Sequence, residues 1–520
     1  MNPFDQVVQW RSEEIHTVMA GNDGFNRSLN NLYGGVTMPQ NPGLGENNWS
    51  SPHQDSYCSE SVGLHGPTYK QLKLIKQYNP YGFTPTMVCN ANNQMIGISF
   101  AQGEGQYRLV IFDEDCNIIS ATKTSTLVPN SFGGGYFYLN QDNNTVVIAN
   151  NCISCYPTAD VAKREEVYSI DPMWSSEDII NLVTGSPDNN SLYSALPVWN
   201  DNTNLYWCLI AGQYDFTPPG SLVSNAWIAV VEITPDASQP GGCRTVLRDA
   251  IELENQWNNN TFAVDQDGAY FVTNALDEEG RCNRGFLHAA AYDTAGGTVS
   301  SRYAAPYENS GFMKPGQTNI GSGTTPTLTD TDDGQKLVAI TDNAYPQVHV
   351  SVYDRNTGAP VANVPVFAKM RGCDEASLIG VNNRFVVENN FGHTVDYPRS
   401  QYVSNEPGMA LVEIGDDVNK DPVIWENNNT CYFAMNMLAR ESGLIFAHTG
   451  DWFDDHSSDK GGMYSICAMD SWDGRIIWRI TLGRGLQYCH EYGGIYFNRK
   501  GDSVYMGTNR YLVCIKDYRD

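Results

Sequence analysis

The sequence lacks any apolar run long enough to cross a membrane. No stretch of the 520 residues approaches the roughly 18 consecutive apolar residues of a transmembrane helix. The first residues, MNPFDQVVQW, have neither the basic start nor the apolar segment of a secretory signal peptide. We therefore expect no membrane span, and a signal peptide that is absent or already removed.

Positive charge is also scarce. The chain has 32 Lys and Arg against 59 Asp and Glu, a formal charge of −27. Such a charge repels phosphate backbones, so nucleic acid is not an expected partner. The few lysines, together with six N-x-Ser/Thr sequons, favour an exported glycoprotein that is secreted or periplasmic. The sequons begin at Asn26, Asn48, Asn143, Asn189, Asn259 and Asn428.

The cysteines lack the spacing of a metal or redox motif. There are 13, an odd number, so at least one thiol stays free if the others pair. NCISC at 151–155 has CxxC spacing, but no second CxxC completes a zinc site and no βαβ pattern surrounds it. We interpret this pair as a structural disulfide or buried thiols, and we expect some of the other cysteines to be paired.

Long amphipathic helices are missing, and β-hairpins stand in their place. The chain contains 47 Gly, 29 Tyr and 11 Trp residues, and only 18% of its residues are charged. This composition favours a β-rich globular protein. Two apolar strands joined by a polar turn recur eight times, at a spacing of about 40 to 65 residues. The copies are at 86–102, 134–151, 197–212, 259–275, 325–344, 377–390, 433–450 and 493–509.

A third strand that ends in an Asp-containing turn follows several hairpins, as in HVSVYDRNTG at 349–358. Repeats of four antiparallel strands without intervening helices are typical of propeller blades. We predict an all-β, eight-bladed β-propeller with four-stranded antiparallel blades over residues 69–520. The last repeat has room for three strands, so a fourth, near 69–78, should close the ring and remove its free edges. Residues 1–68 are expected to form an N-terminal extension packed on the propeller.

The second half of the chain carries a resemblance. AMDSWDGRIIW at 468–478, with Ala468, Asp470, Gly474 and Trp478, resembles the A-x-D-x-x-T-G-x-x-x-W docking repeat of quinoprotein-like (pyrroloquinoline quinone repeat) eight-bladed propellers, with Asp473 at the usual Thr. GSGTTPTL (321–328), AITDNA (339–344), SLIG (377–380) and VVENN (386–390) resemble an uncharacterised group of bacterial propellers. The resemblance spans roughly residues 255–520 and implies the architecture, not an activity.

The resemblance also raises the question of a cofactor. Quinone-dependent alcohol dehydrogenases hold their quinone with calcium through Glu, Asn and Asp side chains and cap it with a disulfide between adjacent cysteines. Glu388, Asn389 and Asp342 offer the oxygen donors that suit calcium. No adjacent Cys-Cys pair occurs in the chain, which argues against pyrroloquinoline quinone. The cofactor therefore stays unknown, with a calcium or transition-metal ion as the alternatives.

Polar and ionisable residues stand at the strand ends. In a propeller blade the innermost strand leaves one face and the second strand returns to it, so these ends should gather around one central funnel. Second strands end near Asn274, Asp342, Asn343, Glu388, Asn389 and His448, and first strands begin near Asn260, His490 and Glu491. His393 follows the sixth hairpin directly. The sequence predicts a polar, ionisable funnel that takes a small-molecule ligand.

These residues suggest acid–base chemistry on a small polar or aromatic molecule. A carboxylate and an imidazole with separated pKa values can act as acid and base, as lyases, isomerases and hydrolases require. We assign proton transfer to His490 and Glu388, with His448. Substrate binding is assigned to Asp342, Asn343, Asn389, His393, Glu491, Asn274 and Asn260, and a possible calcium site to Glu388, Asn389 and Asp342.

Two alternatives remain open at this point. A non-catalytic propeller could present its rim loops at 212–227 and 393–408 to a protein or glycan. A quinone- or metal-dependent oxidoreductase is the other. The inward placement of the ionisable groups favours an enzyme, because burying them costs free energy that a rim binder need not spend. His349 is interpreted as a satisfied strand histidine, and His16, His53 and His65 as surface groups. The oligomeric state cannot be inferred.

Overall fold

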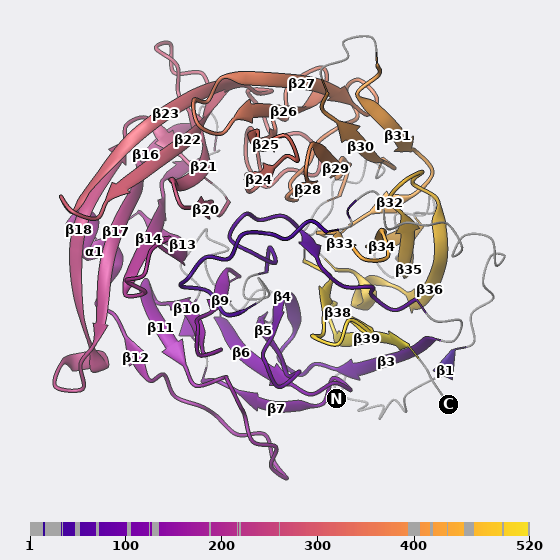
Figure 1. The fold of residues 1–520 in the computed structure, drawn as a ribbon, viewed down its shortest axis with the longest axis horizontal. Coiled ribbons are helices and arrows are strands. Elements are labelled where there is room, and N and C mark those ends of the chain that lie inside the picture. Colours follow the sequence, from indigo (N-terminus) through magenta and orange to yellow (C-terminus); the bar gives the residue numbers. More distant parts are fainter. Residues whose placement is uncertain are drawn as a thin grey trace.

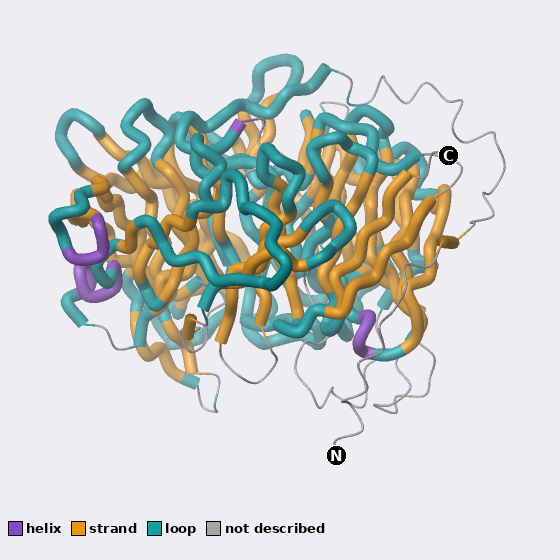
Figure 2. Tube along the Cα trace, turned by 90° about the horizontal axis from the view of Figure 1, so that it is seen from below, coloured by secondary structure: helices purple, strands orange, loops and turns teal. Residues whose placement is uncertain are grey.

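The structure, a computed structural model, shows a closed ring of β-sheets. It describes residues 14–15, 33, 35–46, 52–68, 72–100, 106–123, 125–126, 135–186, 189–215, 217, 220–258, 260–393, 406–415, 420–433, 435–451, 462–490 and 493–517. Eight antiparallel sheets surround a central axis (Figure 1), and their strands run between two faces that carry the loops (Figure 2). The protein is an all-β, eight-bladed β-propeller with mostly four-stranded blades, as predicted.

Blades 1 to 4 follow one another along the first part of the chain. Blade 1 contains β4 (Phe83–Cys89), β5 (Met95–Phe100), β6 (Gln106–Phe112), β7 (Ile118–Ala121) and β8 (Ser125–Thr126). Blade 2 contains β9 (Phe137–Leu139), β10 (Thr145–Ala149), β11 (Cys152–Tyr156) and β12 (Trp174–Ser175), followed by helix α1 (Ile179–Thr184). Blade 3 contains β13 (Ser191–Pro197), β14 (Leu205–Ala211), β17 (Ala226–Pro235) and β18 (Cys243–Leu253), with the side hairpin β15 (Gln213–Asp215) and β16 (Ser221–Ser224) and the 3₁₀ turn η3 (Pro240–Gly242). Blade 4 contains β19 (Gln256–Trp257), β20 (Ala263–Asp265), β21 (Gly268–Ala275), β22 (Arg284–Asp293) and β23 (Thr298–Glu308).

Blades 5 to 8 complete the ring. Blade 5 contains β24 (Thr327–Asp330), β25 (Lys336–Thr341), β26 (Val348–Asp354) and β27 (Pro360–Val366). Blade 6 contains β28 (Ile379–Val381), β29 (Arg384–Glu388), β30 (Met409–Glu413) and β31 (Val423–Asn427). Blade 7 contains β32 (Cys431–Tyr432), β33 (Met437–Ala439), β34 (Leu444–Asp451), β35 (Met463–Asp470) and β36 (Ile476–Arg484), followed by the 3₁₀ turn η4 (Leu486–Tyr488). Blade 8 contains β37 (Tyr496–Phe497), β38 (Ser503–Gly507), β39 (Tyr511–Asp517), β3 (Leu72–Tyr78) and β1 (Glu14–Ile15).

Seven of the eight predicted hairpins supply the two innermost strands of one blade, whereas the stretch at 197–212 contains β14 and only the last residue of β13. The geometry of the hairpin turns explains why glycine occurs in them. Gly268, the first residue of β21, has φ +143°, and a Cβ there would lie 1.8 Å from the Ala290 carbonyl oxygen. Only glycine fits such an approach of two backbones. Local turn chemistry therefore sets where each hairpin reverses.

The hydrophobic core lies between neighbouring blades. Leu337 and Ala339 of blade 5, for example, share one buried cluster with Phe385 and Val387 of blade 6. The predicted docking repeat performs the same role at the next seam. Gly474 leaves room for the Trp425 ring of blade 6, since a Cβ at Gly474 would lie 2.5 Å from that ring.

The ring closes with a strand from the N-terminal side, as predicted. β3 pairs antiparallel with β39, with Ile75 opposite Cys514. Blade 8 is thus built from both ends of the propeller region. The closure leaves no gap between the last blade and the first, because β38 and β37 also contact β4 of blade 1.

The N-terminal extension does more than pack against the ring, because part of it runs through the centre (Figure 1, indigo). Along residues 56–60 it accepts hydrogen bonds from innermost strands of successive blades. The Tyr57 carbonyl accepts from Leu328 N at 2.9 Å, and the Glu60 carbonyl accepts from Leu438 N at 2.9 Å. Strand β2 (Ser61–Val62) then pairs parallel with β33 of blade 7.

The expected cysteine pairing is not found. The structure contains no disulfide between any of the thirteen cysteines. Cys152 and Cys155 both lie in β11, and alternate side chains of a strand point to opposite faces. Residues three apart therefore face away from each other, so this CxxC cannot close a disulfide without breaking the strand.

Candidate functional site

The predicted site residues lie on one face of the ring, which we call the funnel face. The second strands of blades 5 and 6 end there at Thr341 and Glu388, and the innermost strand of blade 8 begins there at Tyr496. Glu491 lies outside the described residues. The other predicted residues separate into two groups, one held in turns and one gathered beside blades 6 to 8.

Asn343 and Asn389 hold loops together. The Asn343 amide donates to the carbonyls of Gly321 and Asp374 at 2.9 and 2.8 Å, and its oxygen accepts from Asp374 N at 2.9 Å. Asn389 donates to the Arg371 carbonyl at 2.9 Å and accepts from Phe391 N at 3.1 Å. Since backbone groups occupy both ends of each amide, these side chains fix the shape of the face, and we withdraw their assignment to substrate binding.

Asp342 is also occupied by its neighbours. Its carboxylate accepts from His349 N at 2.9 Å and pairs with His349 Nδ1 at 2.7 Å. This contact confirms His349 as a satisfied strand histidine. Asp342 therefore points along blade 5 toward β26 and does not reach into the funnel with a free oxygen.

The side chains of Asn274 and Asn260 also form hydrogen bonds within the protein. The Asn274 oxygen accepts from the Tyr307 hydroxyl at 2.9 Å. The Asn260 oxygen accepts from the Tyr136 hydroxyl at 2.5 Å and from Thr325 Oγ1 at 3.1 Å, while its amide donates to the Gly323 carbonyl. Asn260 thus ties blade 4 to blades 2 and 5 near the axis.

Glu388 stands at the centre of the second group. It is 4% exposed, and its two oxygens accept from the amides of Asn390, at 2.8 Å, and Asn436 of blade 7. Burial raises the pKa of Glu388 to about 8, against the opposing effect of these two hydrogen bonds. The carboxyl group therefore carries a proton at neutral pH.

The three predicted histidines converge beside it. The rings of His393 and His448 lie 4.8 and 5.9 Å from the ring of Phe433, between centroids. The rings of His448 and His490 lie 5.6 Å apart, and all three imidazoles are at most 1% exposed. The fold therefore assembles residues that are far apart in sequence, as the hairpin pattern predicts.

His490 has a defined tautomer. Its Nε2 lies 3.0 Å from the Gly494 carbonyl oxygen, which can only accept, so Nε2 carries the proton. Nδ1 is then the basic nitrogen, and it has no hydrogen-bond partner among the described residues. Gly493 makes this ring position possible, because a Cβ there would lie 2.1 Å from Cε1 of His490.

Burial lowers the pKa of two of these imidazoles, His448 and His490, and so keeps them neutral. It lowers the pKa of His490 to about 4. Burial and then the neighbouring imidazoles of His490 and His393 lower the pKa of His448 well below its usual value. A protonated carboxyl and unprotonated imidazoles thus share one region. Glu388 and His490 make no direct contact within the described structure.

The expected metal sites are not formed by the described residues. The oxygens of Glu388, Asn389 and Asp342 accept hydrogen bonds from protein groups, so they do not form a calcium cage. In the part of the chain that the structure describes, no group of three His, Cys, Asp or Glu side chains is arranged to hold a metal ion.

His53 and Glu60, in the N-terminal segment, were missed by the sequence analysis. His53 is 1% exposed and pairs with Glu60 at 2.5 Å, so its interpretation as a surface group is wrong. The His53 ring stacks on Tyr136 at 5.4 Å between centroids. His65 is exposed, as expected, and His16 lies outside the described residues. The segment has no periodic pattern that could have placed the pair at the axis.

Asp374 and Glu375, which precede β28, were left out of the assigned site although CDEA is as acidic as the chosen motifs. Burial raises the pKa of Glu375 to about 7. Burial, then the neighbouring Glu388 carboxyl, raises the pKa of Asp374 well above its usual value. The acidic run directly before a strand was the available signal, since first strands begin at this face.

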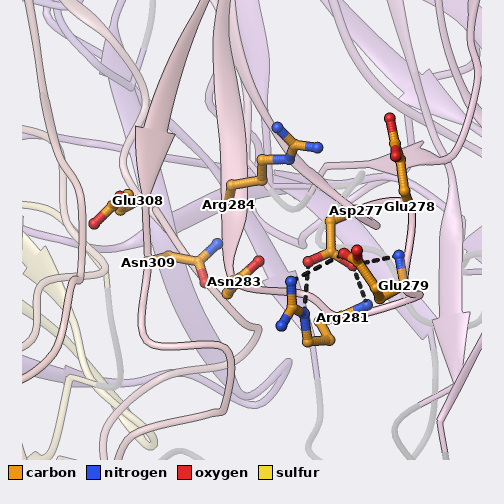
Figure 3. A pocket seen from close by; sticks show the side chains of 8 residues that line it. All are labelled: Asp277, Glu278, Glu279, Arg281, Asn283, Arg284, Glu308 and Asn309. Carbon is orange, nitrogen blue, oxygen red and sulfur yellow. Dashed lines mark hydrogen bonds and ion pairs between the residues drawn. The ribbon is translucent and has the colours of Figure 1, made fainter.

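A separate pocket of about 450 Å³ lies at the rim of blade 4 (Figure 3). Arg281 lies between Asp277 and Glu279 and pairs with both, at 2.7 and 2.9 Å. None of the predicted site residues lines it. The pocket is open to solvent and its main cation is already neutralised, so it offers no buried chemistry.

Comparisons with known proteins assign the chain to no family. No protein-family model and no curated protein sequence matches the chain. Among solved structures, it is similar to a quinohemoprotein alcohol dehydrogenase from Comamonas testosteroni, at 10% identity and TM-score 0.49, over 91% of this chain and 81% of that one. It is also similar to the WD40 domain of SCAP from fission yeast, at 10% identity and TM-score 0.42, over 86% and 98% of the two chains.

A third similar structure is Sqt1 from Saccharomyces cerevisiae, at 10% identity and TM-score 0.45, over 88% of this chain and all of that one. Similarities at this level of identity assign no activity, cofactor or partner to this chain. No helix within the described residues is long and apolar enough to cross a membrane.

Proposed function

We propose that the protein binds a small polar or aromatic molecule on the funnel face of blades 6 to 8 and transforms it by proton transfer. The reaction class would be that of a lyase, isomerase or hydrolase. One observation carries the proposal: the basic nitrogen of His490 is buried, oriented by the Gly494 carbonyl and without a partner among the described residues. Leaving such a group unpaired costs free energy that a purely structural histidine avoids.

The proton donor in this proposal is Glu388. Its pKa of about 8 keeps it protonated at neutral pH, and Asn390 and Asn436 fix both oxygens. His490, with a pKa of about 4, is an unprotonated acceptor. A donor and an acceptor with pKa values pushed apart are what acid–base catalysis needs.

His448 and His393 would line the substrate side of the cluster. The His448 side chain is fully buried, and its ring lies 5.6 Å from the ring of His490, between centroids. The Phe433 ring, which is fully buried, lies against both imidazoles and gives this region an apolar neighbour. Because Glu388 and His490 do not touch, the substrate itself would span the distance between them.

The experiment uses the full-length protein and pools of polar and aromatic metabolites, followed by mass spectrometry. We expect one compound to be consumed by the wild type and spared by the variants Glu388→Gln and His490→Gln. His349→Gln is the matched control, because His349 is a partly buried histidine outside the cluster. Turnover that survives both site variants would contradict the proposal, and binding without turnover would leave a binding protein.

A second candidate is the protein- or glycan-binding scaffold, and a patch at the rim of blades 4 and 5 favours it. Phe312 and Tyr345 are 47% and 52% exposed, and their rings lie 5.5 Å apart, edge to face. Nearby Met370 is 60% exposed, and its amide donates to the Pro346 carbonyl at 2.7 Å. Exposed apolar groups in contact with one another are typical of docking surfaces.

Export is also part of the proposal. Asn189 and Asn428, each the first residue of a sequon, are exposed, so an oligosaccharide could be added without disturbing the fold. Asn143 is different, because its side chain accepts from Arg499 at 2.9 Å. Mass analysis of protein from its native source tests export. Glycan on Asn189 or Asn428 would support it, and unmodified sequons would count against a glycosylating secretory route.

A further inference from the structure

The turn between β6 and β7 of blade 1 holds a cysteine in a conformation that favours glycine. Cys116 has φ +63°, in the left-handed region. The matching turns of blades 4, 5 and 7 place Gly297, Gly358 and Gly474 there, at φ +70°, +72° and +70°. Blade 1 therefore keeps a side chain where its sister blades have none, which calls for a reason in the side chain itself.

The turn between β6 and β7 contacts blade 8, the last blade of the ring. The Tyr505 hydroxyl of β38 donates to the Glu114 carbonyl at 3.0 Å, and Lys516 of β39 pairs with Asp115. Cys514 precedes Lys516 by two residues on the same strand, so both side chains point to the same face of the sheet. Cys514 is thereby directed toward the residue next to Asp115, which is Cys116.

The two thiols meet in a buried, apolar setting. Cys116 is 1% exposed, Cys514 is fully buried, and both belong to one hydrophobic cluster at the seam of blades 1 and 8. Burial and then the adjacent Cys514 thiol raise the pKa of the Cys116 thiol well above its usual value. In this state the Cys116 thiol is a slow nucleophile, because the thiolate is the reactive form.

We propose that Cys116 and Cys514 form a disulfide that clamps the seam where the ring closes. The step is a thiol–disulfide exchange with a small disulfide such as oxidised glutathione. One thiolate attacks a sulfur of the oxidant and releases one glutathione thiolate. The second cysteine then attacks the mixed disulfide, forms the Cys116–Cys514 bond and releases the second glutathione. Two cysteine thiols are oxidised and one small disulfide is reduced to two thiols, so electrons and protons balance.

The position of the bond gives it its effect. It would join a turn of the first blade to the strand that pairs with β3, and so lock both ends of the propeller into the ring. A cross-link between residues so far apart in sequence constrains the unfolded chain strongly. Because both thiols are buried, the bond forms during folding or when the seam opens, and only slowly in the closed native ring.

The test is to unfold and refold the full chain with a mixture of reduced and oxidised glutathione, block remaining thiols, and map peptides without reduction. We expect a linked peptide containing Cys116 and Cys514 and a melting temperature higher by about 5 °C than in dithiothreitol. Cys514→Ser should remove both. Cys208→Ser, at a buried cysteine of blade 3, is the matched control and should retain both.

Cys116→Gly keeps the test decisive if a serine variant folds poorly. Glycine suits φ +63°, so this variant should melt at or above the wild type in dithiothreitol and below it after oxidative refolding. Recovery of both thiols fully blocked after oxidative refolding, or a link from either residue to another cysteine, would overturn the proposal. So would an equal effect of glutathione on the wild type and on Cys116→Gly.

Discussion

Replacing Glu388 by Gln should flatten the pH dependence of stability between pH 5 and 8. The buried carboxyl has a pKa of about 8 in the folded state and an ordinary value of 4.5. A raised pKa means that the folded protein holds this proton more tightly than the unfolded chain. The contribution is therefore complete below pH 4.5 and is lost as the pH rises toward 8.

The size of the effect follows from these two values. Between pH 5 and pH 8, linkage lowers the free energy of unfolding by about 3 kcal/mol through this one group. Gln keeps the shape and can keep the hydrogen bonds to Asn390 and Asn436, because the Asn436 amide can turn over. The variant should thus be more stable than the wild type at pH 8 and similar to it at pH 5.

The assay is urea unfolding of both proteins at pH 5, 6, 7 and 8. Glu413→Gln is the control, because the pKa of Glu413 is lowered and its contribution stays constant over this range. Parallel pH profiles for the wild type and Glu388→Gln would refute the buried, protonated carboxyl. That result would also remove the proton donor from the proposed function.

Three further perturbations test the fold. Arg355→Met should lower the free energy of unfolding by about 3–5 kcal/mol, because it leaves the buried Asp265 carboxylate without its cation. Its control is Lys123→Met, which removes an exposed ion pair and should change the free energy of unfolding by less than about 1 kcal/mol. Gly268→Ala should prevent folding or destabilise the folded protein severely, because the new Cβ would collide with the backbone. Its control is Gly334→Ala, whose Cβ would meet open space and which should lower the free energy of unfolding by only about 1 kcal/mol. Both pairs are compared by denaturant unfolding. Deletion of residues 1–65 should lower the melting temperature and speed proteolysis, because the innermost strands lose their central hydrogen-bonding partner; unchanged values would show that the segment is dispensable.

The architecture could be predicted from sequence because its determinants are local. Two apolar strands and a turn fit within some twenty residues, and seven of the eight predicted units became the inner half of one blade. Even the closure was foreseeable, since the last repeat is one strand short and the strand at 72–78 was available to complete it. Because the same local unit repeats along the chain, the fold could be predicted without the long-range contacts that other folds depend on.

The roles of the strand-end side chains could not be predicted in the same way. Asn343 and His490 both stand where a strand meets the funnel face, and the sequence gives them equal standing. Their difference is tertiary, because two carbonyls and an amide from other loops satisfy Asn343, whereas only one nitrogen of His490 is satisfied. Asn and Asp are common at strand ends because they suit the backbone conformations of turns. Their presence there therefore says little about catalytic chemistry.

His53 shows the opposite error. Its segment has neither alternation nor repeat, so a surface position was the simplest interpretation, yet the chain enters the ring and buries it against Glu60. That placement depends on hydrogen bonds such as the one from Leu328 N to the Tyr57 carbonyl. Those bonds join residues hundreds of positions apart, and no pattern within the segment encodes them.

The approximate symmetry of a propeller offers a way to separate structural from functional polar groups. Each blade must solve the same problem at the funnel face, namely to satisfy the backbone where strands end. In blade 5, Asn343 bonds to the backbone of another loop, and the Asp342 carboxylate pairs with His349 Nδ1. Blades 7 and 8 place His448 and His490 at comparable positions, and the buried Nδ1 of His490 has no hydrogen-bond partner among the described residues. Because the neighbouring blades show that a satisfied solution is available, the unsatisfied one at blade 8 is where a ligand has most to contribute.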